Sequence, residues 1–457
     1  MSQQHIPAQA AGPRVTANVI RGCLGNLIEW YDWFVYASFS IYFASAFFPE
    51  GNQTAQLLST AIVFAVGFLM RPIGGWLLGL YADRFGRRAA LTLSVTLMSV
   101  GSLTIAVTPS HDTIGALAPI LLVTARLAQG LSVGGEWGSS ASYLAEVAPA
   151  GRRGFYSSFQ FVSIVLGQLA ALLVMIVLQR LLSDGQIESW GWRIPFLIGA
   201  VAGLAVMYLR RSMDESQHFE AEKTKAGLQG SATPERRGLI SLFTECPRQL
   251  IAVFGLAIGG TVGYYTFTTY LQKYLVNTAG IPKASVSAIG FAALFLFMLL
   301  QPAVGALSDR MGRRPVMFAF SVGGMLLTVP VMTVLGHTRN PWIAFLLMTV
   351  LLMVLTGYSA LAPIIKAEMF PTKNRALGVG LPHALVTATF GGFTEPIALA
   401  LKKSGHESVF FWYVTGCMAL TFLATLLVRE PSRASTLETD SIVSSGQDLE
   451  KKPAPLT

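Results

Sequence analysis

The chain has 457 residues, of which 53% are hydrophobic and 12% are charged, and its net charge is +9. A soluble globular protein carries about 25% charged residues, so the composition excludes that class and indicates a chain built for lipid. Because one helical crossing of the hydrocarbon core takes about 20 residues, the length allows about twelve crossings.

Apolar runs follow one another from the polar N-terminus to residue 428. Six runs contain no charged residue and no histidine: 89–110, 155–179, 250–272, 284–308, 340–365 and 408–428. Six interrupted runs complete the set: 19–48, 57–80, 113–143, 192–209, 315–336 and 376–401. Only hydrogen bonds within a helix satisfy the backbone in lipid, so these runs predict twelve transmembrane helices.

The first run carries two carboxylates, Glu29 and Asp32, and no cleavage pattern of a signal peptide follows it. Both stand near the bilayer middle at 1.5 Å per residue and share one helix face. Two carboxylates in a low-dielectric site do not both ionise easily, so one is expected to bind and release a proton. Glu136 on the fourth run is a third candidate. The alternative is that these groups satisfy an Asn or Arg inside the bundle.

Basic residues gather in the loops after the second, fourth, eighth and tenth runs: Arg84, Arg87, Arg88, Arg152, Arg153, Arg310, Arg313, Arg314, Lys373 and Arg375. The loops at the opposite ends hold only Arg180, Lys283, Arg339, Lys402 and Lys403, with Lys273 near a helix end. By the positive-inside rule, both termini are predicted to be cytoplasmic. The charge forms no single basic face or arm, so no nucleic-acid partner is expected.

A polar stretch separates six runs from six. The predicted organisation is a cytoplasmic tail at 1–17, a six-helix bundle at 18–209, a cytoplasmic linker at 210–248, a second six-helix bundle at 249–428 and a disordered tail at 429–457.

Two motifs occur in both halves. Gly79-Leu-Tyr-Ala-Asp83-Arg-Phe-Gly86-Arg87-Arg88 returns 226 residues later as Gly305-Ala-Leu-Ser-Asp309-Arg-Met-Gly312-Arg313-Arg314. Ala145-Glu146-Val-Ala-Pro149 returns 222 residues later as Ala367-Glu368-Met-Phe-Pro371. Nearly equal offsets indicate a parallel duplication of a six-helix unit, with a substrate site between the halves near the midplane.

The Gly-x-x-x-Asp-Arg-x-Gly-Arg-Arg loops resemble the signature of the major facilitator superfamily. Strings that resemble its metabolite:proton symporter branch are Asn26-Leu-Ile-Glu29-Trp-Tyr-Asp32, Arg71-Pro-Ile-Gly-Gly75, Arg126-Leu-Ala-Gln129-Gly and Trp190-Gly-Trp-Arg-Ile-Pro195. Strings similar to the bacterial 2-oxoglutarate permeases within that branch begin at Tyr265, Lys366 and Phe411.

The resemblance implies an all-α integral membrane protein with twelve transmembrane helices in two pseudo-symmetric six-helix bundles. It also implies a monomeric, proton-coupled symporter in the bacterial inner membrane, with no cofactor beyond the proton gradient. The expected substrate is a small di- or tricarboxylate, first 2-oxoglutarate. The alternative is another metabolite, namely citrate, shikimate or a betaine or proline-type osmolyte.

Charges repeated in both halves are expected to serve the movement of both halves. They are Asp83, Arg84, Arg87, Arg88, Asp309, Arg310, Arg313, Arg314, Glu146, Arg153, Glu368 and Arg375. At helix ends a carboxylate caps a helix N-terminus and pairs with arginines of a neighbouring loop, a contact that breaks when the halves rock. The alternative is topology anchoring by positive charge alone.

Charges present once are candidates for substrate contact. Arg71 and Arg126 lack a repeated counterpart and project toward the midplane, where a bidentate pair with a substrate carboxylate offsets the burial of a guanidinium. Internal pairing with Glu29, Asp32 or Glu136 is the alternative.

Neutral hydrogen-bonding residues form stripes on the seventh and fifth runs: Tyr265, Thr268, Thr269 and Gln272, and Gln160, Ser163 and Gln168. Such stripes suit a carbonyl-bearing solute or hold helices together. His383 departs from the permease pattern, and Lys366 either contacts substrate or extends to the membrane surface.

Two other classes of function have less support in the sequence. A membrane enzyme needs a catalytic constellation, and the chain has no His-Glu-x-x-His, phosphate loop or Ser elbow. A channel or sensor does not need two repeated gating motifs.

Overall fold

The computed structural model describes residues 13–85, 87–134, 136–149, 151–211, 242–428 and 430, and the regular elements in these ranges are all helices. Most of the predicted tails and of the predicted linker lie outside the described residues, and residues 13–17 of the predicted N-terminal tail belong to the first helix.

Six long helical segments form the first half: α1 (Pro13–Phe47), α2 (Gln53–Phe85), α3 (Arg87–Val107), α5 with α6 (Leu117–Val133, Glu136–Val147), α7 with α8 (Arg153–Ser157, Phe159–Leu181) and α10 (Arg193–Arg211). Three short elements connect them: α4 (His111–Ile114), α9 (Asp184–Gln186) and the π-helical η1 (Ile187–Gly191).

Six more form the second half: α13, η2 and α14 (Pro247–Tyr265, Thr266–Tyr270, Leu271–Asn277), α15 (Lys283–Met311), α16 (Arg313–His337), α17 with α18 (Pro341–Ser359, Ala362–Met369), α19, η3 and α20 (Thr372–Val386, Thr387–Gly391, Gly392–Lys403) and α21 (Glu407–Leu427). Within the described ranges, eight helices are long and apolar enough to cross a membrane. Three shorter apolar helices and α1 cover the remaining predicted runs.

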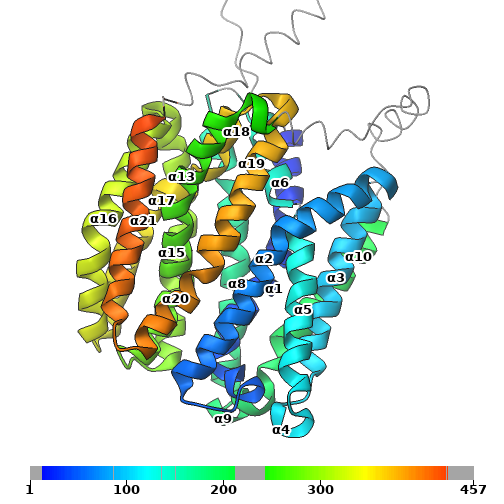
Figure 1. Cartoon of the computed structure of the whole chain (residues 1–457), viewed down its shortest axis with the longest axis vertical. Coiled ribbons are helices and arrows are strands. Elements are labelled where there is room, and N and C mark those ends of the chain that lie inside the picture. The colour runs from blue at the N-terminus through cyan, green and yellow to red at the C-terminus, as the bar shows by residue number, and fades with distance from the viewer. Residues whose placement is uncertain are drawn as a thin grey trace, which may run out of the picture.

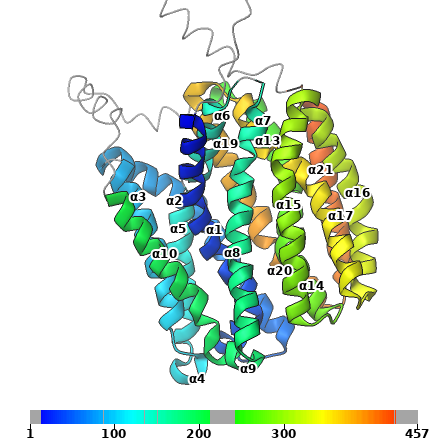
Figure 2. The same cartoon turned by 180° about the vertical axis from the view of Figure 1, so that it is seen from behind.

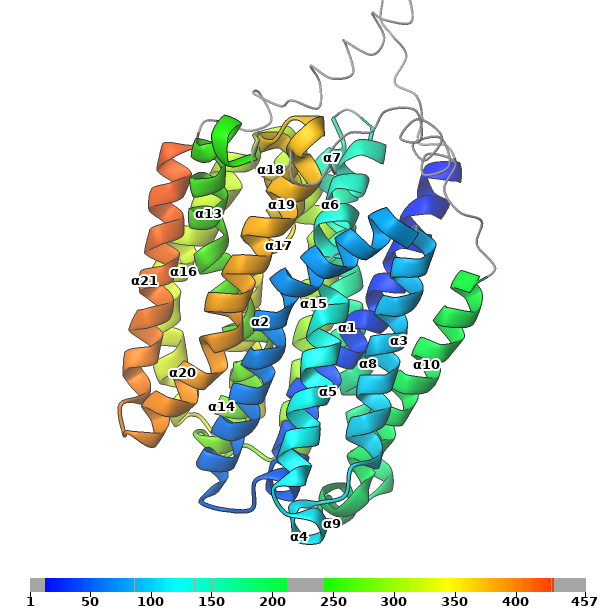
Figure 3. The ribbon, with the colours of Figure 1, turned by 45° about the vertical axis from the view of Figure 1, so that its right-hand side comes forward.

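The helices of the two halves lie side by side. In Figure 1, α16, α17 and α21 lie on one side and α3, α5 and α10 on the other, and Figure 2 shows the same division from behind. The halves meet where α15 contacts α7 and α8, where α2 contacts α20 and where α19 contacts α6. We call the end at which α1 begins the terminus end, and the end with α4 and α9 the far end (Figure 3).

The distribution of side chains is the reverse of that in a soluble protein. Large apolar residues such as Trp76, Trp342 and Leu326 are more than half exposed, whereas Arg126 and Lys366 are buried. Lipid solvates apolar side chains as well as a core does, so only the polar groups must be enclosed.

Helices α2 and α5 approach closely through glycines. A Cβ added to Gly130 would overlap the carbonyl oxygen of Gly67, and one added to Gly134 would overlap that of Arg71. The glycine spacing of the fourth run therefore brings a neighbouring backbone into contact, and it fixes Arg71 and Arg126 on adjacent helices.

Gly134→Ala is expected to lower the melting temperature in detergent, because the added methyl group forces α5 away from α2 and such overpacking costs about 1–3 kcal/mol. Gly416→Ala is the control: Gly416 lies in α21, and an added Cβ there has no atom within 4 Å. Equal melting temperatures for the two variants would contradict a tight contact at Gly134.

Candidate functional site

Two buried arginines from neighbouring helices flank one tryptophan of α1 in the first half. The guanidinium carbons of Arg71 and Arg126 lie 4.0 and 4.1 Å from the ring centroid of Trp33. Phe68 further surrounds Arg71, and Tyr36 further surrounds Arg126, at 4.3 and 4.4 Å. Aromatic faces stabilise a cation by their quadrupole, but they cannot accept the directional hydrogen bonds of a guanidinium.

Arg126 is linked to Asp32 through an amide. Its Nη1 donates to Oε1 of Gln129 at 2.8 Å, and Nε2 of Gln129 donates to Oδ2 of Asp32 at 2.5 Å. Ser102 donates a further, short hydrogen bond to Asp32. No direct ion pair joins Arg126 to a carboxylate among the described residues.

Several donors of these arginines are unused. Within the described part of the chain, Nε and Nη2 of both Arg71 and Arg126 lack a hydrogen-bond acceptor. Leaving a buried charged donor unsatisfied is costly, so the arrangement favours an added anion.

The structure separates the two carboxylates of α1. Glu29 lines a pocket on the terminus side of Trp33, whereas Asp32 points to Ser102 and Gln129 inside the first half. The expectation that both occupy one site is therefore wrong. Residues three apart on a helix share a face but differ by about 60° in direction and about 4.5 Å in height, so neighbouring helices can surround them differently.

The terminus-side pocket combines residues of both halves, including Asn26, Glu29 and Arg71 from the first half and His383 and Thr387 from the second. Lys366 lies behind His383, with Nζ 3.0 Å from its Nδ1 and 4.5 Å from the ring of Trp137. Trp137 also stacks on His383 at 3.5 Å. Lys366 is 1% exposed and does not extend to the membrane surface.

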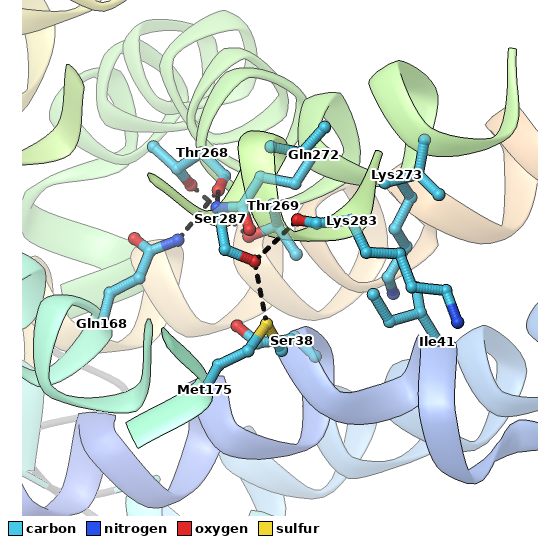
Figure 4. A pocket seen from close by; sticks show the side chains of 13 residues that line it. Ser38, Ile41, Gln168, Met175, Thr268, Thr269, Gln272, Lys273, Lys283 and Ser287 are labelled. Carbon is cyan, nitrogen blue, oxygen red and sulfur yellow. Dashed lines mark hydrogen bonds between the residues drawn. The ribbon is translucent and has the colours of Figure 1, made fainter. Parts of the chain in front are cut away.

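A second pocket, the far-side pocket, lies nearer the far end, because its α1 residues follow those of the first pocket along the helix. Figure 4 shows this pocket from close by. Its lining includes Gln168 of α8, Thr268 and Thr269 of η2, and Gln272 and Lys273 of α14. Nε2 of Gln168 donates to the carbonyl oxygen of Thr268 at 2.8 Å, which connects the halves.

Four aromatic residues separate the two pockets. We define the aromatic layer as Trp33, Phe68, Tyr264 and Tyr265, whose neighbouring ring centroids are 4.7, 5.1 and 5.5 Å apart. Along α1 the terminus-side pocket uses residues up to Trp30, and the far-side pocket begins at Ala37. The layer joins α1 and α2 to α13.

Two predicted stripe residues lie elsewhere than expected. Tyr265 belongs to the aromatic layer, because the π-helical turn η2 changes the helix phase before Thr268 and Thr269. Gln160 accepts a hydrogen bond from Ser140 of α6 at 2.8 Å and lines neither pocket.

Two ion pairs are not predicted from the sequence. Lys273 pairs with Glu395 in a buried position, and Lys283 pairs with Glu188 at 2.9 Å, which joins the halves at the far end. A lone carboxylate within a predicted transmembrane run, such as Glu395, is the signal that could have revealed the first pair.

Repeated charges join the halves at the terminus end. Asp309 accepts hydrogen bonds from the backbone N–H groups of Gly154 and Phe155 at 2.8 and 3.0 Å, at the N-terminus of α7. Arg313 pairs with Asp309 at 2.8 Å and with Glu368 at 3.1 Å.

Arg375 of the second half pairs with Glu146 of the first at 2.8 Å. This contact joins the carboxylate of one motif to an arginine of a neighbouring loop in the other half, which is the kind of pairing expected from the repeated charges. Arg314 bonds the last carbonyl groups of α21, Arg310 is exposed and Arg153 is the first residue of α7.

The first copy of the motif is only partly described. The side chains of Asp83, Arg84, Arg87 and Arg88, and that of Glu136, lie outside the described part of the structure, so their predicted roles stay predictions.

The fold and the polar, cation-lined centre define a polytopic α-helical membrane transporter. Residues 19–439 match the sugar (and other) transporter family, and the chain belongs to this family of major facilitators.

The comparisons with individual proteins agree with this class. The chain is 49% identical to the alpha-ketoglutarate permease of Escherichia coli K12, over 92% of this chain and 95% of that protein. It is 34% identical to a citrate-proton symporter of Klebsiella pneumoniae (91% and 93% covered) and 32% identical to the shikimate transporter of E. coli K12 (90% and 93% covered).

Among solved structures, the partially occluded inward-open xylose transporter XylE of E. coli superposes with a TM-score of 0.71 at 20% identity, covering 90% of this chain and 98% of that one. The expected transporter class, rather than a membrane enzyme, is confirmed by these relatives.

Proposed function

We propose that this protein imports a small dicarboxylate, first 2-oxoglutarate, by proton symport across the bacterial inner membrane, as a monomer with both termini cytoplasmic. The observation that carries the proposal is the set of unused guanidinium donors on Arg71 and Arg126. Bidentate hydrogen bonds from these donors match carboxylate geometry. The permease and citrate symporter names of two relatives support an anionic substrate.

The proton is proposed to bind Asp32, with Glu29 and Glu136 as the further candidates. Asp32 is 2% exposed and reaches Arg126 through Gln129, so a substrate carboxylate at Arg126 alters the electrostatic environment of Asp32. Through this relay, substrate binding at Arg126 and proton binding at Asp32 each change the free energy of the other.

Alternating access is proposed to occur by rocking of the units 18–209 and 249–428 against each other. Contacts across the halves at both ends support this movement. Asp309 with α7 and Arg375 with Glu146 close the terminus end, and Lys283 with Glu188 holds the far end. No cofactor beyond the proton gradient is needed for this cycle.

Purified protein in liposomes is expected to accumulate labelled 2-oxoglutarate when an inward proton gradient is imposed, and a protonophore is expected to abolish the accumulation. Unlabelled citrate, shikimate, betaine and glutarate serve as competitors, with protein-free liposomes as the control. Uptake that is independent of the proton gradient and is driven by a sodium gradient would contradict proton symport. Inhibition by betaine or shikimate, and none by glutarate, would contradict a dicarboxylate substrate.

A further inference from the structure

A buried ion pair stands beside the far-side pocket in the second half. Lys273 of α14 and Glu395 of α20 are in contact, and each side chain is 5% exposed. In the described part of the chain, each is the other's only ion-pair partner. A buried pair of this kind often costs as much in desolvation as it returns in attraction, so stability alone gives little reason for it.

Only one member of the pair faces the pocket. Lys273 lines the far-side pocket, whereas Glu395 lies behind it. The remaining polar lining comprises a second lysine, two amides and four hydroxyl groups: Lys283, Gln168, Gln272, Ser38, Thr268, Thr269 and Ser287. No carboxylate belongs to the described lining. The pocket therefore presents cations and neutral hydrogen-bonding groups, while the counter-ions Glu395 and Glu188 lie outside it.

The far-side pocket is also close to the first arginine site along α1. The ring of Tyr36 lies 4.4 Å from the guanidinium carbon of Arg126, and the next two residues of α1, Ala37 and Ser38, line the same pocket as Lys273. The pocket thus begins one residue beyond the tyrosine that packs on Arg126.

We propose that the far-side pocket is a loading site for a dicarboxylate, in which Lys273 exchanges Glu395 for one carboxylate of the substrate. The inference rests on the proposed function and adds a specificity-determining residue to it. A buried ammonium needs a counter-ion, which Glu395 supplies in the empty pocket and the ligand supplies in the filled one.

Counter-ion exchange also gives selectivity. A dicarboxylate can place one carboxylate at Lys273 and extend the other toward Arg126. A monocarboxylate satisfies only one of these cations, and a betaine brings its own positive charge toward Lys273. The pair thus favours dianions by rejecting ligands that leave a buried cation uncompensated.

The test measures binding of labelled 2-oxoglutarate to the purified full chain in detergent. Glu395→Gln removes the competitor of the ligand, so its Kd is expected to fall about tenfold, which corresponds to about 1.4 kcal/mol. The double variant Lys273→Gln/Glu395→Gln removes both charges without leaving either alone, and its Kd is expected to rise about tenfold above that of the parent. Melting temperatures report folding.

Glutarate and butyrate serve as matched competitors, since they differ in one carboxylate. The double variant is expected to lose most of the preference for glutarate that the parent shows. Weaker or unchanged binding by Glu395→Gln would overturn counter-ion exchange, and parental binding by the double variant would remove Lys273 from the site. A parent protein that binds no dicarboxylate would overturn the proposed function and this inference with it.

Discussion

Arg126→Lys is expected to lower 2-oxoglutarate uptake by about a hundredfold, because the charge-assisted hydrogen bonds that a planar guanidinium makes to a carboxylate are worth about 1.5–3 kcal/mol. The guanidinium of Arg126 is held between aromatic rings, and Gln129 fixes its Nη1. Nε and Nη2 therefore keep one orientation. An ammonium offers a single charge centre and cannot make the same two-point contact.

The measurement is uptake into liposomes together with substrate binding in detergent, which separates a binding defect from a defect in movement. Arg180→Lys is the control, because Arg180 is exposed at the end of α8. It is expected to transport as the parent does. Unchanged affinity in Arg126→Lys would exclude Arg126 from the substrate site.

Asp309→Asn is expected to open the terminus end while leaving the binding site intact. Asp309 of the second half accepts hydrogen bonds from Gly154 and Phe155 of the first half, and these bonds exist only while the two halves are closed at this end. Asparagine keeps the size but removes the charge that favours a helix N-terminus. A loss of about 1.4 kcal/mol in one conformation changes the population ratio about tenfold.

A cysteine reporter measures this population. Ala384 lines the terminus-side pocket, so Ala384→Cys in a background without native cysteines is expected to react faster with a thiol reagent when Asp309 is replaced. Glu188→Gln is the matched control, since it weakens the pair with Lys283 at the far end and is expected to slow the same reaction. Parental labelling in a folded Asp309→Asn protein with impaired transport would instead assign Asp309 to insertion or folding.

The sequence predicted the helices well, because lipid imposes a simple rule on composition. The charge-free run 250–272 lies inside the continuous segment α13, η2 and α14, and the run 284–308 lies inside α15. The predicted capping by Asp309 also agrees with its contacts at α7, since a repeated carboxylate at a helix end has few other roles.

Contacts between distant segments could not be predicted in this way. Lys273 and Glu395 are 122 residues apart, and only the packing of α14 beside α20 brings them together. The π-helical turn η2 likewise has no periodic signal, so the sequence pattern groups Tyr265 with Thr268 although Tyr265 belongs to the aromatic layer. The relay from Arg126 through Gln129 to Asp32 depends on the packing of α5 against α1 and on the direction of one α1 side chain.

The aromatic layer has an electrical consequence. Its four residues are at most 6% exposed, so the layer is a stretch of buried, packed rings between the two pockets. A charged substrate that passes between the pockets through this layer moves within the membrane voltage. An interior-negative potential of 100 mV opposes the inward movement of a dianion alone by about 4.6 kcal/mol. Two accompanying protons cancel that opposition, and uptake that accelerates with the potential would show that more than two protons move with each substrate molecule.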